Sequence, residues 1–152
     1  MEIESLRAIL RRHRRIALDT SIFIYQLQAN PRYVDLTHHV FSWLERPPAS
    51  AVTSTISMTE LLVQPYRDSD EGCIDAFLSL IPAFPNLDWI APDLEIAILA
   101  AQLRALHRLR TPDALQAATA VRAQATALIT NDPDFDRLSS LLEVVVLDRL
   151  FS

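Results

Sequence analysis

The chain has almost no glycine and no lysine. Its 152 residues include a single glycine, Gly72, where average usage would give about ten. A lone glycine excludes the dinucleotide loop GxGxxG, the phosphate loop GxxxxGK[ST] and the nucleophile elbow GxSxG. All 14 basic residues are arginine, which also excludes the Schiff-base, kinase and phosphate-loop chemistries that depend on a lysine.

Cysteine is equally scarce, and long apolar runs are missing. Cys73 is the single cysteine, so an internal disulfide and a cysteine-based zinc site are excluded and a reducing environment is favoured. No charge-free apolar run approaches the ~20 residues of a membrane-spanning helix, and the start, Met-Glu-Ile-Glu, lacks the layout of a signal peptide. We therefore expect a globular cytoplasmic protein without a membrane partner.

The net charge of −5 is unevenly distributed along the chain. Residues 1–15 carry five arginines and two acids, whereas residues 16–152 carry nine arginines and seventeen acids. An acidic body binds polyanions poorly, so a nucleic-acid partner would need local arginines or bound cations.

Short β-branched runs alternate with longer helical patterns, which predicts α/β architecture around a parallel sheet. We divide the chain into an arginine-rich helical extension, residues 1–14, and one domain, residues 15–152. The five predicted strands are Arg15–Asp19, Ala51–Thr55, Leu87–Ile90, Ala127–Thr130 and Val144–Leu147. Helices are predicted at about 3–14, 20–28, 32–45, 57–63 and 70–80, after Pro92 and from Thr111. The helix after Pro92 is predicted to pack on the sheet through the stripe Leu94, Ala97, Ile98, Ala101 and Ala105.

Acidic residues stand where predicted strands end or helices begin. They are Asp19 after the first strand, Glu60 in Ser-Met-Thr-Glu, Asp113 in Thr-Pro-Asp, and Asp132 and Asp134 in Asn-Asp-Pro-Asp. Each has an ordinary role as a helix cap, and Ser57 with Glu60 reads as a capping box. In an open parallel sheet, however, ligands bind outside the carboxyl ends of the strands. Carboxylates that meet there need a counter-charge, and oxygen-only ligands suit Mg²⁺ or Mn²⁺.

The ordered set of motifs resembles the PIN-domain ribonuclease family, and is most similar to the VapC-type toxins of toxin–antitoxin systems. The likeness covers about residues 15–148 and rests on Asp-Thr-Ser, Ser-x-x-Glu, Thr-Pro-Asp-Ala-Leu-x-Ala-Ala and Leu-Ile-Thr-Asn-Asp-x-Asp-Phe. The spacings agree as well, with 41 residues from Asp19 to Glu60, 53 more to Asp113 and 19 more to Asp132. The resemblance implies a three-layer α/β/α fold with five parallel strands in the order 3-2-1-4-5.

The resemblance also implies a set of site residues. Asp19, Glu60, Asp113 and Asp132 would be the catalytic, metal-binding acids with Asp134 as an accessory, and whether Asp132 or Asp134 is the nearer ligand stays open. Thr130, together with Ser21 or Thr20, would support the carboxylates by hydrogen bonds. Arg104, Arg108 and Arg110, just upstream of Asp113, are candidates for holding RNA phosphates.

The function implied is that of a Mg²⁺- or Mn²⁺-dependent endoribonuclease that cleaves single-stranded RNA. The implied partners are an antitoxin, whose C-terminal segment inserts a basic residue among the acids, and a second copy of the chain in a homodimer. Two alternatives remain. One is a PIN nuclease of RNA processing or decay, and the other is an inactive scaffold whose acids only cap helices. The four histidines are assigned to surface or packing roles.

Overall fold

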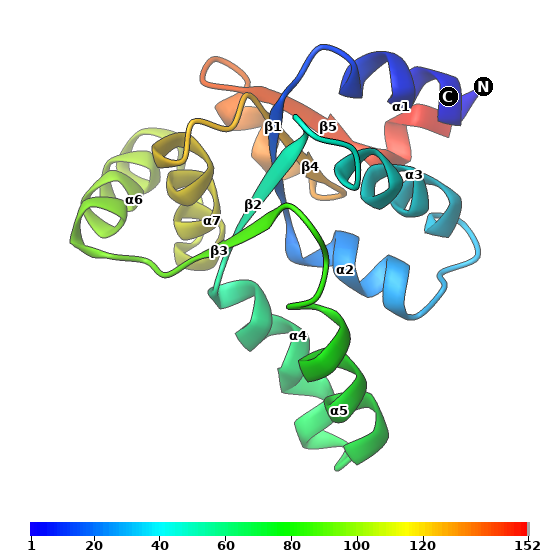
Figure 1. The fold of residues 1–152 in the computed structure, drawn as a ribbon. Coiled ribbons are helices and arrows are strands. Elements are labelled where there is room, and N and C mark those ends of the chain that lie inside the picture. The colour runs from blue at the N-terminus through cyan, green and yellow to red at the C-terminus, as the bar shows by residue number, and fades with distance from the viewer. Residues whose placement is uncertain (152) are drawn as a thin grey trace.

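The fold is organised around one parallel sheet, as the sequence predicts. A computed structural model describes residues 1–151. The sheet has the order β3-β2-β1-β4-β5, and every neighbouring pair is parallel. The strands are β1 (Arg15–Leu18), β2 (Ser50–Ser54), β3 (Leu87–Ile90), β4 (Ala127–Thr130) and β5 (Glu143–Val146). The predicted strand order is confirmed, and β1 lies at the centre of the sheet (Figure 1).

Seven α-helices and two short 3₁₀ segments connect the strands within residues 1–151. They are α1 (Glu2–Leu10), α2 (Thr20–Leu27), α3 (Val34–Leu44), α4 (Ile56–Arg67), α5 (Glu71–Leu80), α6 (Leu94–His107), α7 (Thr111–Arg122), η1 (Pro133–Leu138) and η2 (Leu147–Phe151). Every predicted helix is present. The predicted bounds differ most at α1, which ends at Leu10, and at α4, which continues through Pro65 to Arg67. None of the helices in this part of the chain is long and apolar enough to cross a membrane.

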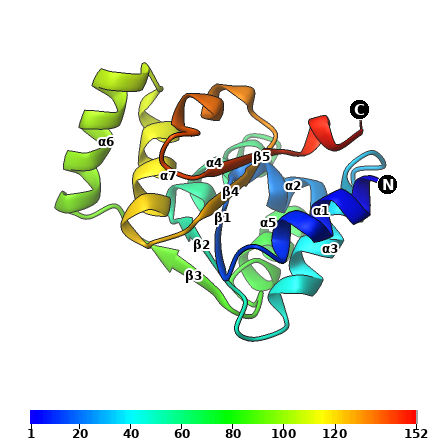
Figure 2. The same ribbon diagram turned by 90° about the horizontal axis from the view of Figure 1, so that it is seen from above.

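Alternation along β1 gives the sheet two buried faces. Ile16 and Leu18 belong to one core with α1, α2, α3 and α5, whereas Ala17 joins Val52 in a second core with α6 and α7. Because successive strand residues point to opposite faces, a four-residue apolar strand serves both cores. Figure 2 shows α6 and α7 on one side of the sheet and α1, α2 and α3 on the other, which confirms the three-layer architecture.

The predicted burial of α6 is wrong. Leu94 and Ile98 are 75% and 54% exposed, and the buried stripe is Ile96, Ala100 and Leu103. Both stripes have helical spacing, so periodicity alone does not decide which one faces inward. The structure also places α6 against α7, whose small residues allow close approach, while α7 is the helix that contacts β2.

Helix α1 packs as part of the domain. Leu6 and Leu10 are fully buried in the same core as Ile16, Val40 and Leu44. The single arginine of α1, Arg7, is exposed, as the amphipathic pattern of the segment requires.

Candidate active site

The first predicted acid follows the central strand directly. The backbone N–H of Asp19 donates to the carbonyl oxygen of Ile129 at 3.0 Å, so Asp19 lies beside the end of β4. Asp132 comes two residues after β4 ends at Thr130. Because parallel strands end at the same edge, Asp19 and Asp132 stand at the carboxyl edge of the sheet, where α2 and α4 also begin (Figure 1).

Asp19 is held by two hydrogen bonds. It caps α2, where its Oδ1 accepts from the backbone N–H of Thr20 at 2.8 Å, and its Oδ2 accepts from Thr130 Oγ1 at 2.7 Å. Burial raises the pKa of Asp19 from its ordinary 3.8 to about 6. The two hydrogen bonds lower this pKa by less than burial raises it, and the nearby charges of Glu60 and Asp113 add a smaller increase. The carboxylate is thus fixed in position while its charge is poorly compensated.

Glu60 is positioned by the first turn of α2. Thr20 Oγ1 donates to Glu60 Oε1 at 2.9 Å, which ties α4 to the residue that follows Asp19. Of the two predicted hydroxyls, Thr20 and Ser21, Thr20 is therefore the one that hydrogen-bonds to a carboxylate of the site. The neighbouring Ser21 Oγ is buried and has no hydrogen-bond partner within residues 1–151.

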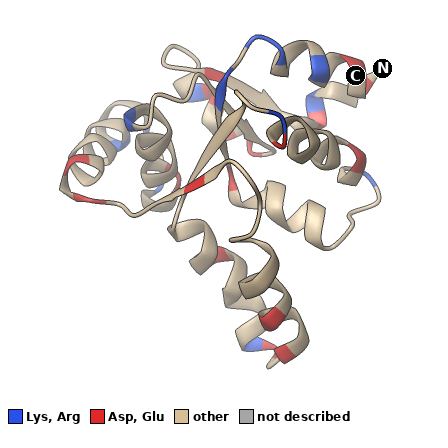
Figure 3. Cartoon of the chain, viewed as in Figure 1, with Lys and Arg blue, Asp and Glu red and all other residues tan. Residues whose placement is uncertain are grey.

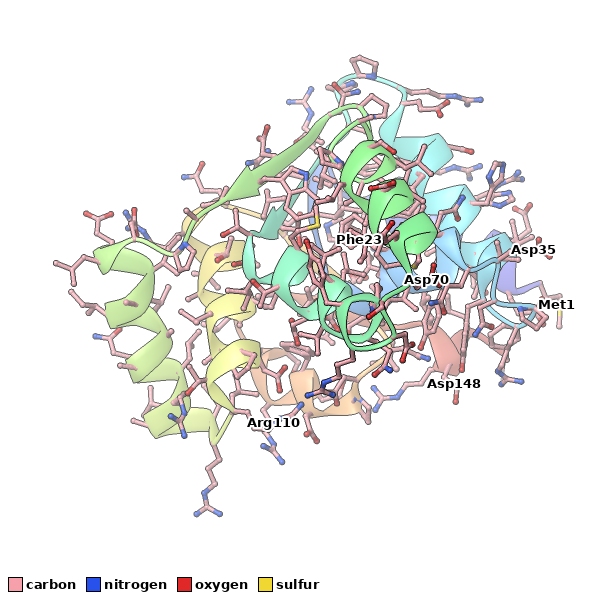
Figure 4. The ribbon with its side chains drawn as sticks, turned by 90° about the horizontal axis from the view of Figure 1, so that it is seen from below. Met1, Phe23, Asp35, Asp70, Arg110 and Asp148 are labelled. Atoms are coloured by element: carbon pink, nitrogen blue, oxygen red, sulfur yellow. The ribbon has the colours of Figure 1, made fainter. Side chains whose placement is uncertain are left out.

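Asp113 enters the site from the first turn of α7. Its side chain is 13% exposed, and its Oδ2 accepts from Arg110 Nε at 3.3 Å. Burial raises the pKa of Asp113, the guanidinium of Arg110 lowers it, and the charges of Asp132 and Glu60 raise it. Electrostatic interactions thus join the four predicted acids. Arg110, which lies just before the start of α7 (Figure 4), is a cation in contact with one of them.

Thr130 joins the two strand-end acids. Besides donating to Asp19, its Oγ1 accepts from the backbone N–H of Asp132 at 3.0 Å. Asp132 Oδ1 in turn accepts from the N–H of Asp134 as the cap of η1. The carboxylate of Asp134 is half exposed and lies 3.8 Å from Arg137. These contacts favour Asp132 over Asp134 as the nearer member of the cluster.

A buried polar network under the acids was not found from the sequence. Gln116 Nε2 donates to Ser57 Oγ at 2.6 Å and lies 3.4 Å from Thr20 Oγ1. Thr53 Oγ1 donates to the carbonyl of Leu18 at 2.9 Å and lies 2.8 Å from Ser57 Oγ. The network therefore ties Thr20, the partner of Glu60, to α7 and β2. The one sequence feature that points to this network is Gln116, a polar residue among the small, buried residues of α7.

One predicted local role does not occur. Ser57 and Glu60 form no capping box, because α4 begins at Ile56 with Thr55 as its N-cap and Ser57 is buried in the network. In α7 the N-cap is Arg110, and the hydroxyl of Thr111, the first residue of the helix, accepts from Arg104 at 2.9 Å.

The three candidate arginines differ in their surroundings. Arg104 also donates to the carbonyl of Leu109, so its contacts brace the connection between α6 and α7. Arg108 is the left-handed C-cap of α6, with φ 57°. Only Arg110, 78% exposed, contacts an acid of the site among these three.

The donor set fits a hard divalent cation, although no three acidic, histidine or cysteine side chains in residues 1–151 are close enough to hold a metal as they lie. The site offers carboxylate and hydroxyl oxygens, which Mg²⁺ and Mn²⁺ prefer. Like charges repel, and the chain has no lysine to neutralise them.

Fold and site together define a three-layer α/β protein with an acidic site at the carboxyl edge of the sheet. The sequence profile of the PIN domain matches residues 16–141, and the chain belongs to the PIN domain family. A comparison with curated proteins gives no match.

Several solved structures share this fold. FitAcB from Neisseria gonorrhoeae is similar with a TM-score of 0.67 and 20% identity, covering 87% of this chain and 97% of that one. A toxin–antitoxin complex from Klebsiella pneumoniae has a TM-score of 0.61 and 23% identity over the same shares. VapBC2 from Rickettsia felis, bound to a DNA fragment from its promoter, has a TM-score of 0.60 and 21% identity, covering 86% and 96%.

Proposed function

We propose that this protein is a Mg²⁺- or Mn²⁺-dependent endoribonuclease that cleaves single-stranded RNA. The observation that carries the proposal is the arrangement around Asp19. Two hydrogen bonds fix this carboxylate while Glu60 and Asp113 add negative charge beside it. A helix cap requires no such neighbours, whereas a cation-binding site does. Membership of the PIN family supports the same conclusion.

Asp19, Glu60, Asp113 and Asp132 are the residues proposed to hold the metal. A divalent ion held by these residues would lower the pKa of a bound water molecule and neutralise charge on the scissile phosphate. Thr130 fixes Asp19 relative to Asp132, and Thr20 fixes Glu60, so two hydroxyls set the spacing of three acids. The exposed guanidinium of Arg110 stands at the rim of the site, where it is placed to hold a flanking phosphate.

Cleavage of a mixed panel of single-stranded RNAs, with Mn²⁺ or with a chelator, tests this proposal. Asp19→Asn and Asp113→Asn are expected to abolish metal-dependent cleavage. Asp93→Asn is the matched control. Like Asp113, Asp93 follows a proline, but it only caps α6, where it accepts from the N–H of Ile96. Undiminished cleavage by Asp19→Asn and Asp113→Asn would refute the assignment. Absence of Mn²⁺ binding in calorimetry would favour the inactive scaffold.

We further propose that the nuclease is the toxin of a type II toxin–antitoxin pair. The support is its similarity to a solved chain from a toxin–antitoxin complex. The proposed antitoxin is a small protein with a basic residue that reaches the acids. Expression of the wild type is expected to arrest growth, and Asp19→Asn is expected to relieve the arrest. RNA cleavage without growth arrest would instead indicate a role in RNA processing or decay.

A homodimer is proposed through the outward face of α6. Leu94, Ile98 and Leu106 are each more than half exposed, which is unusual for apolar side chains on one helix. A second copy of this face would cover them.

A further inference from the structure

Two adjoining hollows lie between α1 and the end of α3. The first, of about 620 Å³, is lined by Arg7, Arg11, His38, His39, Trp43 and Arg46, among others. The second, of about 320 Å³, shares Arg11, Trp43 and Arg46 and adds His13 and Arg14. We call the two hollows together the basic groove. No aspartate or glutamate lines either one.

Several arginines of the basic groove are free to bind an anion. Arg11, Arg14 and Arg46 make no ion pair and no side-chain hydrogen bond with any residue in the described range 1–151. Arg7, which also lines the groove, pairs with Glu4, and elsewhere Arg15 and Arg32 pair with aspartates. In a chain of net charge −5, like charges gathered without acidic partners repel one another, and a polyanion would relieve that repulsion.

Trp43 distinguishes the basic groove from a simple patch of positive charge. Its half-buried ring lines both hollows, as do Arg11 and Arg46. Arginines that follow a groove, together with an aromatic ring, are the features with which proteins bind single-stranded nucleic acid, through phosphates and base stacking. An acidic peptide would use the charge and leave the ring without a role.

The basic groove is distinct from the acidic site. Arg14 accepts a backbone hydrogen bond from Ser50 at the start of β1 and β2, whereas Asp19 follows the other end of β1. The four residues of β1 separate the two by roughly 13 Å of strand. Figure 3 shows the arginine-bearing segments of α1, the start of β1 and the end of α3 at the end of the sheet away from α4. Helix α1 also lies outside the residues that match the PIN profile.

We propose that the basic groove binds single-stranded RNA, with its phosphates on Arg11, Arg14 and Arg46 and a base against Trp43. The choice of RNA rests on the proposed function. The groove then holds a distant part of the strand that the acidic site cuts, so long RNAs are bound more tightly than short ones.

Fluorescence anisotropy with a labelled U20 oligonucleotide tests the proposal. Using Asp19→Asn protein in chelator removes cleavage and metal from the measurement. Adding Arg11→Ala and Arg46→Ala is expected to weaken binding about tenfold or more, because each lost charge-assisted contact is worth on the order of a few-fold to tenfold. The salt dependence of log K should fall by about 0.7 per lost phosphate contact. All substituted arginines are exposed, so folding is expected to persist.

The matched control is Arg67→Ala with Arg122→Ala, which removes the same charge from exposed positions outside the basic groove. Binding of U20 by this control should stay within about twofold of the parent. If binding depended on non-specific charge alone, both double variants would be weakened equally. Equal loss in the two double variants, or no loss in either, would overturn the proposal. Tighter groove-dependent binding of a poly-glutamate peptide than of U20 would overturn it in favour of an acidic protein partner.

Tryptophan fluorescence tests the role of Trp43 separately. The chain has two tryptophans, so Trp89→Phe leaves Trp43 as the single tryptophan. U20 is expected to quench it, and Arg11→Ala with Arg46→Ala is expected to remove the quenching. Unquenched Trp43 at saturating U20 would overturn the stacking contact.

The two proposals fail in different ways. A protein that binds U20 through the basic groove but cuts no RNA would refute the nuclease and leave the groove assigned. A metal-dependent nuclease whose groove variant binds U20 as tightly as the parent would do the reverse.

Discussion

Asp19→Asn is expected to stabilise the metal-free protein at neutral pH while abolishing its activity. The pKa of Asp19 is about 6 in the folded chain against an ordinary 3.8, so the folded state binds this proton more tightly than the unfolded state. The free energy of unfolding therefore falls as pH rises from about 4 to about 6 and is constant above that range. Ionisation of Asp19 over this interval lowers the free energy of unfolding by about 3 kcal/mol. Asparagine does not ionise, so Asp19→Asn avoids this loss.

Asparagine keeps only part of the hydrogen bonding. Its Oδ1 replaces the acceptor for the N–H of Thr20, but its Nδ2 then faces Thr130 Oγ1, which donates to Asp19 in the wild type. That mismatch costs about 1 kcal/mol. This cost is independent of pH. The decisive quantity is therefore how far the difference in free energy of unfolding between Asp19→Asn and wild type changes from pH 4 to pH 7.

Urea unfolding in chelator at several pH values measures this difference. The stability of Asp19→Asn relative to wild type should rise by up to about 3 kcal/mol across the range. Asp93→Asn, at the exposed cap of α6, should change the stability at pH 7 little, because asparagine caps helices about as well as aspartate. Saturating Mn²⁺ should stabilise the wild type alone, since a ligand that binds only the folded state adds to its stability. A pH-independent difference between Asp19→Asn and wild type would refute the reasoning.

Three further predictions concern the supports of the site and the surface of α6. Thr130→Val removes the hydroxyl shared by two acids and should weaken Mn²⁺ affinity by about 10- to 100-fold in calorimetry, whereas Thr130→Ser should restore it. Gln116→Leu leaves Ser57 without its amide donor and should lower the free energy of unfolding by about 1–3 kcal/mol in urea; an unchanged value would remove the network from the account. Leu94→Glu with Ile98→Glu should convert a dimer to a monomer in light scattering, and a persistent dimer would place the interface elsewhere.

The sheet could be predicted because its strands are short apolar runs. Ile16, Ala17 and Leu18 are all buried, as a central parallel strand requires, and the residue that follows such a strand falls at the carboxyl edge. That rule places Asp19 beside Asp132 from the sequence alone. The phase of α6 could not be predicted in the same way, because apolar residues occur on both of its faces and the small residues of α7 decide which face is covered.

The polar network was hidden for a different reason. Gln116 and Ser57 are 59 positions apart, and their hydrogen bond exists only because α7 packs beside the start of α4. Local pattern assigned Ser57 to a helix cap, but burial among Thr20, Thr53 and Gln116 gives its hydroxyl better partners than the exposed helix end. Sequence reasoning found the charged groups and missed the neutral ones that hold them.

The two ends of the sheet differ in charge, so they attract RNA under different conditions. At the carboxyl edge, Asp19 and Asp113 repel phosphate until a cation joins them, and Arg110 alone offsets only part of their charge. At the opposite end, Arg11 and Arg46 need no cation to attract the same polyanion. RNA binding should therefore persist in chelator while cleavage stops. Adding metal should restore cleavage but change the affinity for RNA little.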